Sequence, residues 1–79
     1  MIQTDYFGNK VITIIINGEP KTVYLHVVED SDYYHIGYSD FPDSIILCAW
    51  FYYKSSYRTL EDAVRQYVKA VNAYYREEE

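Results

Sequence analysis

Two stretches of alternating side chains, joined by a short acidic segment, constrain the fold of this chain more than any other feature. In residues 22–28 an aliphatic side chain recurs at every second position, and residues 33–39 alternate in a similar way. A period of two is typical of β-strands, because successive side chains point to opposite faces of a sheet. Residues 29–32 between them are rich in Asp and Ser, which favour turns. The pattern predicts a β-hairpin.

The two alternations also predict how the strands of this hairpin are paired. If residues 29–32 form a four-residue loop, Val28 lies opposite Tyr33, and the aliphatic side chains of both strands gather on one face. The other face then places His26 directly opposite His35, and the chain has only these two histidines. Such a pair is either a reactive or metal-binding site or simply the polar side of a sheet.

Three further segments complete the expected fold. Residues 11–16 are β-branched and run into an Asn-Gly dipeptide, which favours a tight hairpin turn. Residues 45–53 are apolar on both faces, as in a central strand that is covered on both sides. Residues 60–76 carry apolar side chains at helical spacing after Thr59, a suitable N-cap. The prediction is a single α+β domain over residues 1–79, a four-stranded antiparallel β-meander with one C-terminal helix packed on one face (strands about 11–16, 22–28, 33–39 and 45–53; helix about 60–76).

A single helix cannot cover both faces of a four-stranded sheet, so we expect one face to carry an interaction surface. The chain has 79 residues and eleven tyrosines, whose large rings with a polar tip suit half-buried contact positions. Exposed apolar faces of this kind usually mark sites of interaction. The pattern leaves open which side of the fourth strand lies on this face. It is either the side that carries Ile46, Cys48, Trp50 and Tyr52 or the alternate side.

The charge distribution and the single cysteine narrow the class of protein. The net charge is −5, and no Lys or Arg occurs between Thr22 and Tyr53. Without a dense basic patch we expect no direct nucleic-acid binding, whereas an acidic surface suits a basic protein surface. Cys48 is the only cysteine, so no intramolecular disulfide is possible and a reducing compartment is expected. The chain shows no signal-peptide pattern and no run of about 20 apolar residues, so we expect a cytoplasmic protein without a membrane span.

His26 and His35 are the candidate metal ligands. Two imidazoles on opposed strand positions are close enough to share an ion. A zinc site needs about four ligands, however, and the same face offers only Cys48 as a third. The sequence therefore favours two half-exposed polar residues on an interaction face, and no metal or cofactor is expected.

The sequence does not favour an enzyme. Cys48 lies in an apolar strand, where a thiol is usually inert, and the scattered glycines form no phosphate-binding motif. The carboxylate pairs Asp30 with Asp32 and Asp40 with Asp43 fall in turns, where Asp is common for backbone reasons. These acids could imitate nucleic-acid phosphates, but they divide between the two ends of one hairpin, so solvated turns are the simpler interpretation.

Two short motifs resemble those of a known family. The chain reads Tyr-Ser-Asp-Phe-Pro-Asp over residues 38–43 and Thr-Leu-Glu-Asp-Ala over residues 59–63. In this order they resemble the N-terminal module of HicB-type antitoxins, and the resemblance covers about residues 22–72. It implies a β-β-β-α module without catalytic activity that covers the working surface of a partner protein, in that family an RNA-cleaving toxin. In size and character the chain is also similar to anti-CRISPR proteins made by phages.

The expected function is therefore that of a non-enzymatic, protein-binding inhibitor. Its partner would be a nucleic-acid-processing protein with a basic surface, which the inhibitor blocks by occupying that surface. The alternative is a self-associating structural or accessory module that uses the aromatic sheet face as a homodimer interface. The predicted contacts are Tyr24, His26, Tyr33, His35 and Trp50, and the predicted charge partners are Asp30, Asp32, Asp40 and Asp43.

Overall fold

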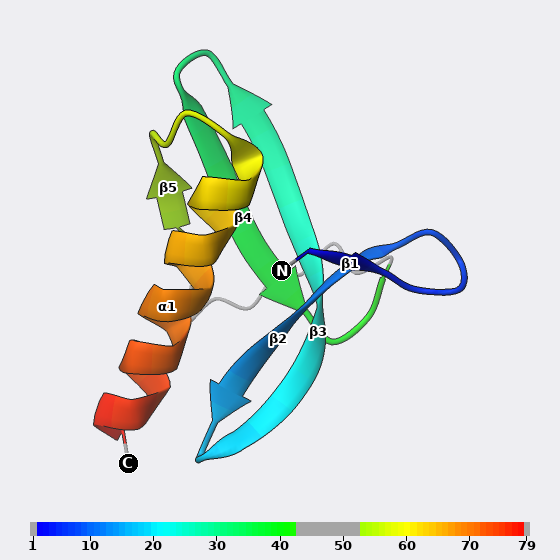
Figure 1. The fold of residues 1–79 in the computed structure, drawn as a ribbon, viewed down its shortest axis with the longest axis vertical. Coiled ribbons are helices and arrows are strands. Elements are labelled where there is room, and N and C mark those ends of the chain that lie inside the picture. The colour runs from blue at the N-terminus through cyan, green and yellow to red at the C-terminus, as the bar shows by residue number, and fades with distance from the viewer. Residues whose placement is uncertain (1, 43–52, 79) are drawn as a thin grey trace.

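The protein folds as an antiparallel β-sheet with one α-helix packed along one face (Figure 1). The computed structural model describes residues 2–42 and 53–78. Within these residues the sheet contains five strands in chain order, each paired with the next. This arrangement confirms the predicted α+β meander with a C-terminal helix. The elements are β1 (Gln3–Thr4), β2 (Lys10–Ile16), β3 (Glu19–Asp30), β4 (Tyr33–Ser39), β5 (Tyr53–Ser55) and α1 (Leu60–Glu78).

The predicted boundaries agree closely for some elements and differ for others. The strand predicted over residues 33–39 is β4, and the helix predicted over 60–76 begins as expected but continues to Glu78. β1 was not expected, since two residues are too short to show a periodic pattern, so the sheet formed by the described residues has five strands and not four. Most of the strand predicted over 45–53 lies outside the described residues, and β5 begins at its last residue, Tyr53.

The pairing of β3 with β4 corrects the predicted register by two residues. His26 lies opposite Gly37, and His35 lies opposite Val28, so the two histidines do not face each other. The prediction was wrong because β3 continues through its acidic end to Asp30, which leaves a turn of two residues and not four. A shift of two residues leaves every side chain on its predicted face, whereas a shift of one would have exchanged the faces.

The connection between β2 and β3 has the geometry that its sequence favours. Asn17 and Gly18 both adopt positive φ, at 53° and 79°, which suits a two-residue hairpin turn. β1 pairs with β2 only at Lys10 and Val11. Further along β2, the backbone N–H of Ile15 donates to Oδ1 of Asn72 in α1, at 2.8 Å. The helix therefore supplies a hydrogen-bond acceptor at the part of the β2 edge that β1 does not reach.

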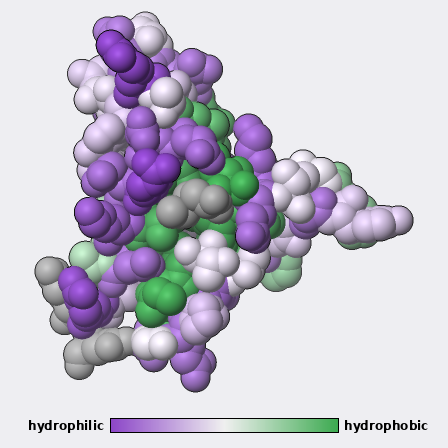
Figure 2. All heavy atoms as spheres, in the orientation of Figure 1, coloured by the Kyte–Doolittle hydropathy of each residue, from purple (hydrophilic) through white to green (hydrophobic). Residues whose placement is uncertain are grey.

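The core lies between α1 and the sheet face turned toward it. Tyr67 of α1 is the largest fully buried side chain, and its ring meets that of Tyr53 edge to face, at 6.2 Å between centroids. The hydroxyls of Tyr38 and Tyr75 form a hydrogen bond that joins β4 to the helix. In Figure 2 hydrophobic atoms show in the middle of the view, beside a hydrophilic outer side of the helix. The buried cluster comprises Ile12, Ile14, Val23, Leu25, Ile36, Tyr38, Ala63, Val64, Tyr67, Val68 and Val71.

The start of α1 is capped as its sequence predicts. The hydroxyl of Thr59 accepts a hydrogen bond from the backbone N–H of Asp62 at 3.2 Å and donates to the Asp62 carboxylate at 3.0 Å. The same carboxylate pairs with Arg65 at 2.9 Å. This cap fixes where the helix begins, and hence where the preceding residues, 56–58, lie against the rest of the fold.

Candidate functional site

The sheet face turned away from α1, here called the second face, carries most of the side chains selected from the sequence. Alternation along the strands places Tyr24, His26 and Asp30 of β3 on it, with Tyr33 and His35 of β4. Its exposure is uneven. Tyr33 is 39% exposed near the β3–β4 turn, whereas Tyr24 and His26 are half-buried. Four of the predicted contacts, Tyr24, His26, Tyr33 and His35, thus share one face, and Tyr33 is the exposed one among them.

His26 takes part in a short chain of hydrogen bonds. Its Nε2 lies 2.6 Å from Oγ of Ser39, and that hydroxyl donates to the backbone carbonyl of Phe41 at 2.7 Å. Because the hydroxyl proton is directed to the carbonyl, the Ser39 oxygen accepts from the imidazole N–H. The serine is therefore not activated as a nucleophile, and the chain instead holds the segment after β4 against the sheet. Sequence analysis missed Ser39, since only the observed register places it diagonally from His26.

His35 has a different partner. Its Nε2 lies 3.4 Å from Oδ2 of Asp30, and the two side chains are 20% and 62% exposed. The two histidines therefore contact different groups at different positions along the hairpin. Within the described ranges, no group of three or more His, Cys, Asp and Glu side chains is placed to hold a metal ion. Cys48, the third ligand considered from the sequence, lies outside those ranges.

Tyr33 lies beneath a lysine from the neighbouring strand. Nζ of Lys54 in β5 lies 4.0 Å from the centroid of the Tyr33 ring, a cation–π geometry. Lys54 is paired with His35 across the ladder, so the lysine crosses diagonally to reach the ring. A molecule that binds Tyr33 must therefore either displace this ammonium group or contact it.

The four predicted charge partners do not form one cluster. Asp40 pairs with Lys21 at 3.0 Å, and both side chains are more than half exposed, so this contact adds little stability. Asp30 and Asp32 lie at the other end of the β3–β4 hairpin. Asp43 and the predicted contact Trp50 lie outside the described residues.

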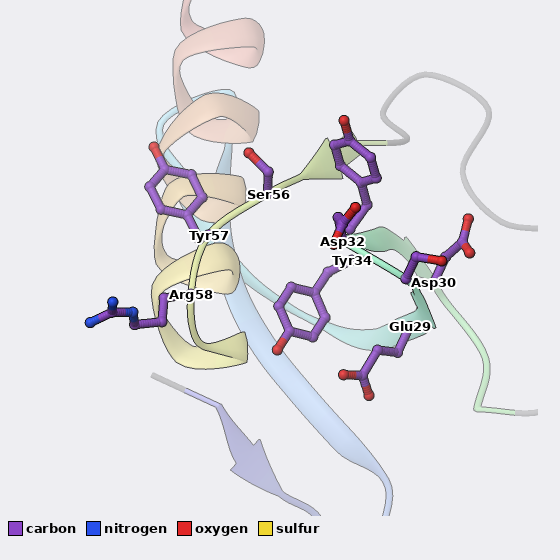
Figure 3. A pocket seen from close by; sticks show the side chains of 9 residues that line it. Glu29, Asp30, Asp32, Tyr34, Ser56, Tyr57 and Arg58 are labelled. Carbon is purple, nitrogen blue, oxygen red and sulfur yellow. The ribbon is translucent and has the colours of Figure 1, made fainter.

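A cleft of about 340 Å³ opens beside the β3–β4 turn, where the segment between β5 and α1 passes close to it (Figure 3). Glu29 and Asp30 lie on one side and Tyr57 and Arg58 on the other, with Tyr34 between them. The Arg58 side chain points away from the carboxylates. The cleft brings three predicted residues, Asp30, Asp32 and Tyr33, together with two that the sequence analysis missed, Tyr57 and Arg58. Its full lining is Glu29, Asp30, Ser31, Asp32, Tyr33, Tyr34, Ser56, Tyr57 and Arg58.

A second group missed from the sequence lies in the loop between β1 and β2. Tyr6 is 95% exposed and Phe7 is 83% exposed. This loop projects from the rest of the molecule, at the right of the view (Figure 1). The sequence contains a turn signal here, since Asp5 and Gly8 flank the two rings. No strand was predicted before it, however, so the residues were not recognised as a loop between two strands.

Comparison with known proteins does not add to these observations. No protein-family model, no curated protein and no solved structure matches the chain. Among the described elements, no helix combines the length and the hydropathy needed to cross a membrane.

Proposed function

We propose that the protein is a non-enzymatic inhibitor that binds a nucleic-acid-processing protein and occupies its basic surface. The observation that carries the proposal is the mixture of carboxylates and tyrosine rings around the cleft beside the β3–β4 turn. We call this region the hairpin-end surface, and define it as Glu29, Asp30, Asp32, Tyr33, Tyr57 and Arg58.

The chemistry of the hairpin-end surface suits arginine and lysine side chains of a partner. Carboxylates accept charge-assisted hydrogen bonds from a guanidinium or ammonium group, and tyrosine rings stack on the same groups. Asp30 is 62% exposed and therefore accessible to a partner, whereas Tyr33 is 39% exposed and stacks on a partner cation where that cation displaces Lys54 from the ring. Proteins that handle nucleic acids carry such basic groups, because they must neutralise phosphates.

The overall charge supports the same partner class. With a net charge of −5, the chain is attracted to a basic protein surface and repelled by nucleic acid itself. Charge of this kind mainly accelerates encounter and selects partners, while buried rings supply most of the affinity. The resemblance of residues 38–43 and 59–63 to HicB-type antitoxins implies the same mode of action, a surface that covers a partner without catalysis.

The test uses immobilised protein to capture a partner from the native host, followed by binding measurements with the purified partner. We expect the double variant Asp30→Asn/Asp32→Asn to bind at least about tenfold more weakly. Glu19→Gln is the matched control, since it removes an exposed carboxylate at the other end of β3, outside the predicted contacts and charge partners. The unaltered protein should also displace a fluorescent oligonucleotide from the partner. A partner that binds the double variant equally well, or keeps its oligonucleotide, contradicts the proposal.

Self-association is a second candidate, and one observation favours it. Val28 on the second face is 65% exposed, an apolar side chain beside His35 in the ladder. In a homodimer formed through this face Val28 would be buried. Light scattering at low micromolar concentration distinguishes the two candidates: a dimer that Val28→Ser dissociates supports self-association, whereas a monomer leaves the face for another protein.

A further inference from the structure

The loop between β1 and β2 is held in one shape by hydrogen bonds to a single residue. Oδ1 of Asp5 accepts from the backbone N–H groups of Phe7 at 2.9 Å and of Asn9 at 2.8 Å. The backbone of Asp5 also accepts from Gly8 at 3.1 Å and donates to Asn9 at 2.9 Å. Gly8 adopts a φ of +88°, a conformation that favours glycine. The loop is therefore a closed turn whose shape is largely set before anything binds.

Two aromatic rings stand on this closed turn. The rings of Tyr6 and Phe7 pack edge to face, with centroids 5.3 Å apart and planes at 87°. Even so, the residues are 95% and 83% exposed, more than any other large hydrophobic residue in the described part of the chain. In Figures 1 and 2 the loop projects well beyond the sheet, in keeping with the high exposure of the two residues. We call Tyr6 and Phe7 the aromatic tip.

An exposed pair on a fixed support is well suited to binding. Aromatic side chains dominate the affinity of many protein interfaces when they enter a pocket on the partner. The cost of ordering flexible groups is lower when they are already held in the bound shape. At the aromatic tip, the hydrogen bonds from Asp5 have already restricted the backbone that carries both rings.

The shape and charge of the tip indicate what it enters. It is a projection, so its partner must offer a cavity, and the carboxylate of Asp5 is directed to the loop's own N–H groups and not outward. The cavity is therefore expected to be apolar. A membrane is a poor fit, because the chain has a net charge of −5 and peripheral binding relies on basic residues beside the apolar ones.

A second copy of the chain is also a poor fit. If two tips met, their four rings would bury about 600–1,000 Å² in total, taking about 150–250 Å² for each ring. A stable interface needs about 1,200–2,000 Å². The tip is thus too small to hold a dimer by itself, but it suits one part of a larger interface with another protein.

We propose that Tyr6 and Phe7 form an aromatic anchor that inserts into an apolar pocket of the partner protein. This inference rests on the proposed function, and it adds a second contact region that differs chemically from the hairpin-end surface. The hairpin-end surface attracts a basic protein surface, and the aromatic tip then supplies affinity by burying its rings.

The test measures binding of the purified partner to tip variants. Tyr6→Ser and Phe7→Ser should each weaken binding about tenfold to a hundredfold, mostly through faster dissociation. Phe41→Ser is the matched control, since Phe41 is also 71% exposed and its side chain lies outside both proposed regions. It should change the affinity less than about twofold, as expected for a residue outside the energetic centre of an interface. All three variants should keep their melting temperature, because none of these side chains is buried.

A second variant tests the hydrogen bonds that hold the loop, and not the rings themselves. Asp5→Ala keeps both rings but removes the acceptor for the N–H groups of Phe7 and Asn9. It should weaken binding by less than the loss of a ring, while Asp5→Asn, which keeps an oxygen acceptor, should bind nearly as well as the original. Equal affinity of Asp5→Ala and the unaltered chain would contradict a preorganised anchor.

The remaining outcomes separate this inference from the proposed function. If tip variants bind normally while Asp30→Asn/Asp32→Asn binds weakly, the anchor is wrong and the inhibitor proposal stands. If instead the tip variants bind weakly while Asp30→Asn/Asp32→Asn binds normally, the anchor is supported and the role of the hairpin-end surface is contradicted. Two controls use the protein alone. Flotation with phosphatidylcholine vesicles that is lost in the tip variants would assign the tip to lipid, and a dimer that Phe7→Ser dissociates would assign it to a second copy. Either result would overturn the inference. Failure to retain any partner would contradict both proposals.

Discussion

The β1–β2 loop and the β3–β4 turn both join antiparallel strands, but they are built in opposite ways. The first is closed by two backbone hydrogen bonds of Asp5 and by its carboxylate, which accepts from the loop amides, and it presents two aromatic rings. The second is closed by the strand ladder, with Asp30 paired to Tyr33, and it presents carboxylates. A turn closed by its ladder needs no particular side chain, so its residues are free to carry charge. A loop held in part by one side chain depends on that residue.

This difference suggests a division of roles between the two regions. Charged side chains on an exposed turn act at long range and are weakened by salt, so they contribute mainly to the rate of encounter. Rings on a fixed loop act only at contact and contribute mainly to the lifetime of a complex. The following predictions test whether the two regions really differ in how their shape is maintained.

The largest effect is expected from Asp5→Ala. Loss of the carboxylate should raise the hydrogen-exchange rates of the Phe7 and Asn9 amides by about tenfold or more, because both lose their acceptor. Asp32→Ala is the counterpart in the β3–β4 turn and should leave exchange at Tyr33 nearly unchanged, since the ladder closes that turn. Equal effects of the two substitutions, measured by NMR, would remove the distinction between the regions.

A smaller effect is expected from Gly8→Ala. An added Cβ meets no atom within 4 Å, so the cost comes only from the φ of +88° and should be about 1 kcal/mol. Gly8→Asn should cost less, because asparagine tolerates this conformation better than alanine. Ser31→Ala should be nearly neutral, since among the described residues positive φ occurs only at Gly8, Asn17 and Gly18. Urea unfolding of the three variants measures the order, and a neutral Gly8→Ala would contradict the strain argument.

The smallest effect is expected from acid. Desolvation raises the pKa of Asp5, but the hydrogen bonds of the loop, those from Asn9 foremost, outweigh it and hold this pKa below its ordinary value of 3.8. Because the folded-state pKa is lowered, the stabilising contribution is fully present above pH 3.8 and is lost as the pH falls through the lower value.

An NMR titration of the loop amides tests this sign. The amides of Phe7 and Asn9 should shift together with a midpoint below pH 3.8, while the Gly18 amide in the β2–β3 turn serves as an internal reference. Asp5→Asn should abolish the step. A step above pH 3.8, or one that persists in this variant, would show that Asp5 is not the titrating group.

For β3 and β4 the sequence was sufficient to predict which face each residue occupies, but not how the two strands align. The alternation at Val23, Leu25 and Val27 requires only that the strand be extended, and the structure buries the first two in the core. Register depends in addition on where the turn begins. Glu29 and Asp30 have low strand preference, yet pairing with Tyr34 and Tyr33 keeps them in β3, so tertiary pairing outweighed local preference.

The candidate site was predictable in part for the same reason. Residues on the second face follow from alternation, and five of the predicted contacts and charge partners lie there: Tyr24, His26, Asp30, Tyr33 and His35. Tyr57 and Arg58 join the cleft only because the capped start of α1 brings their segment to the β3–β4 turn, and no periodic pattern in the sequence encodes that approach. Tyr6 and Phe7 were missed because β1 is too short to be recognised.

The hydrogen bond from Ile15 to Asn72 has a consequence for the behaviour of this chain in concentrated solution. A strand edge with unbonded amides is a template on which other chains can add strands, and such growth leads to aggregation. The edge of β2 beyond β1 consists of β-branched residues, a composition that favours this growth. By occupying an amide there, the helix both covers the core and blocks one position from which a fibril could start.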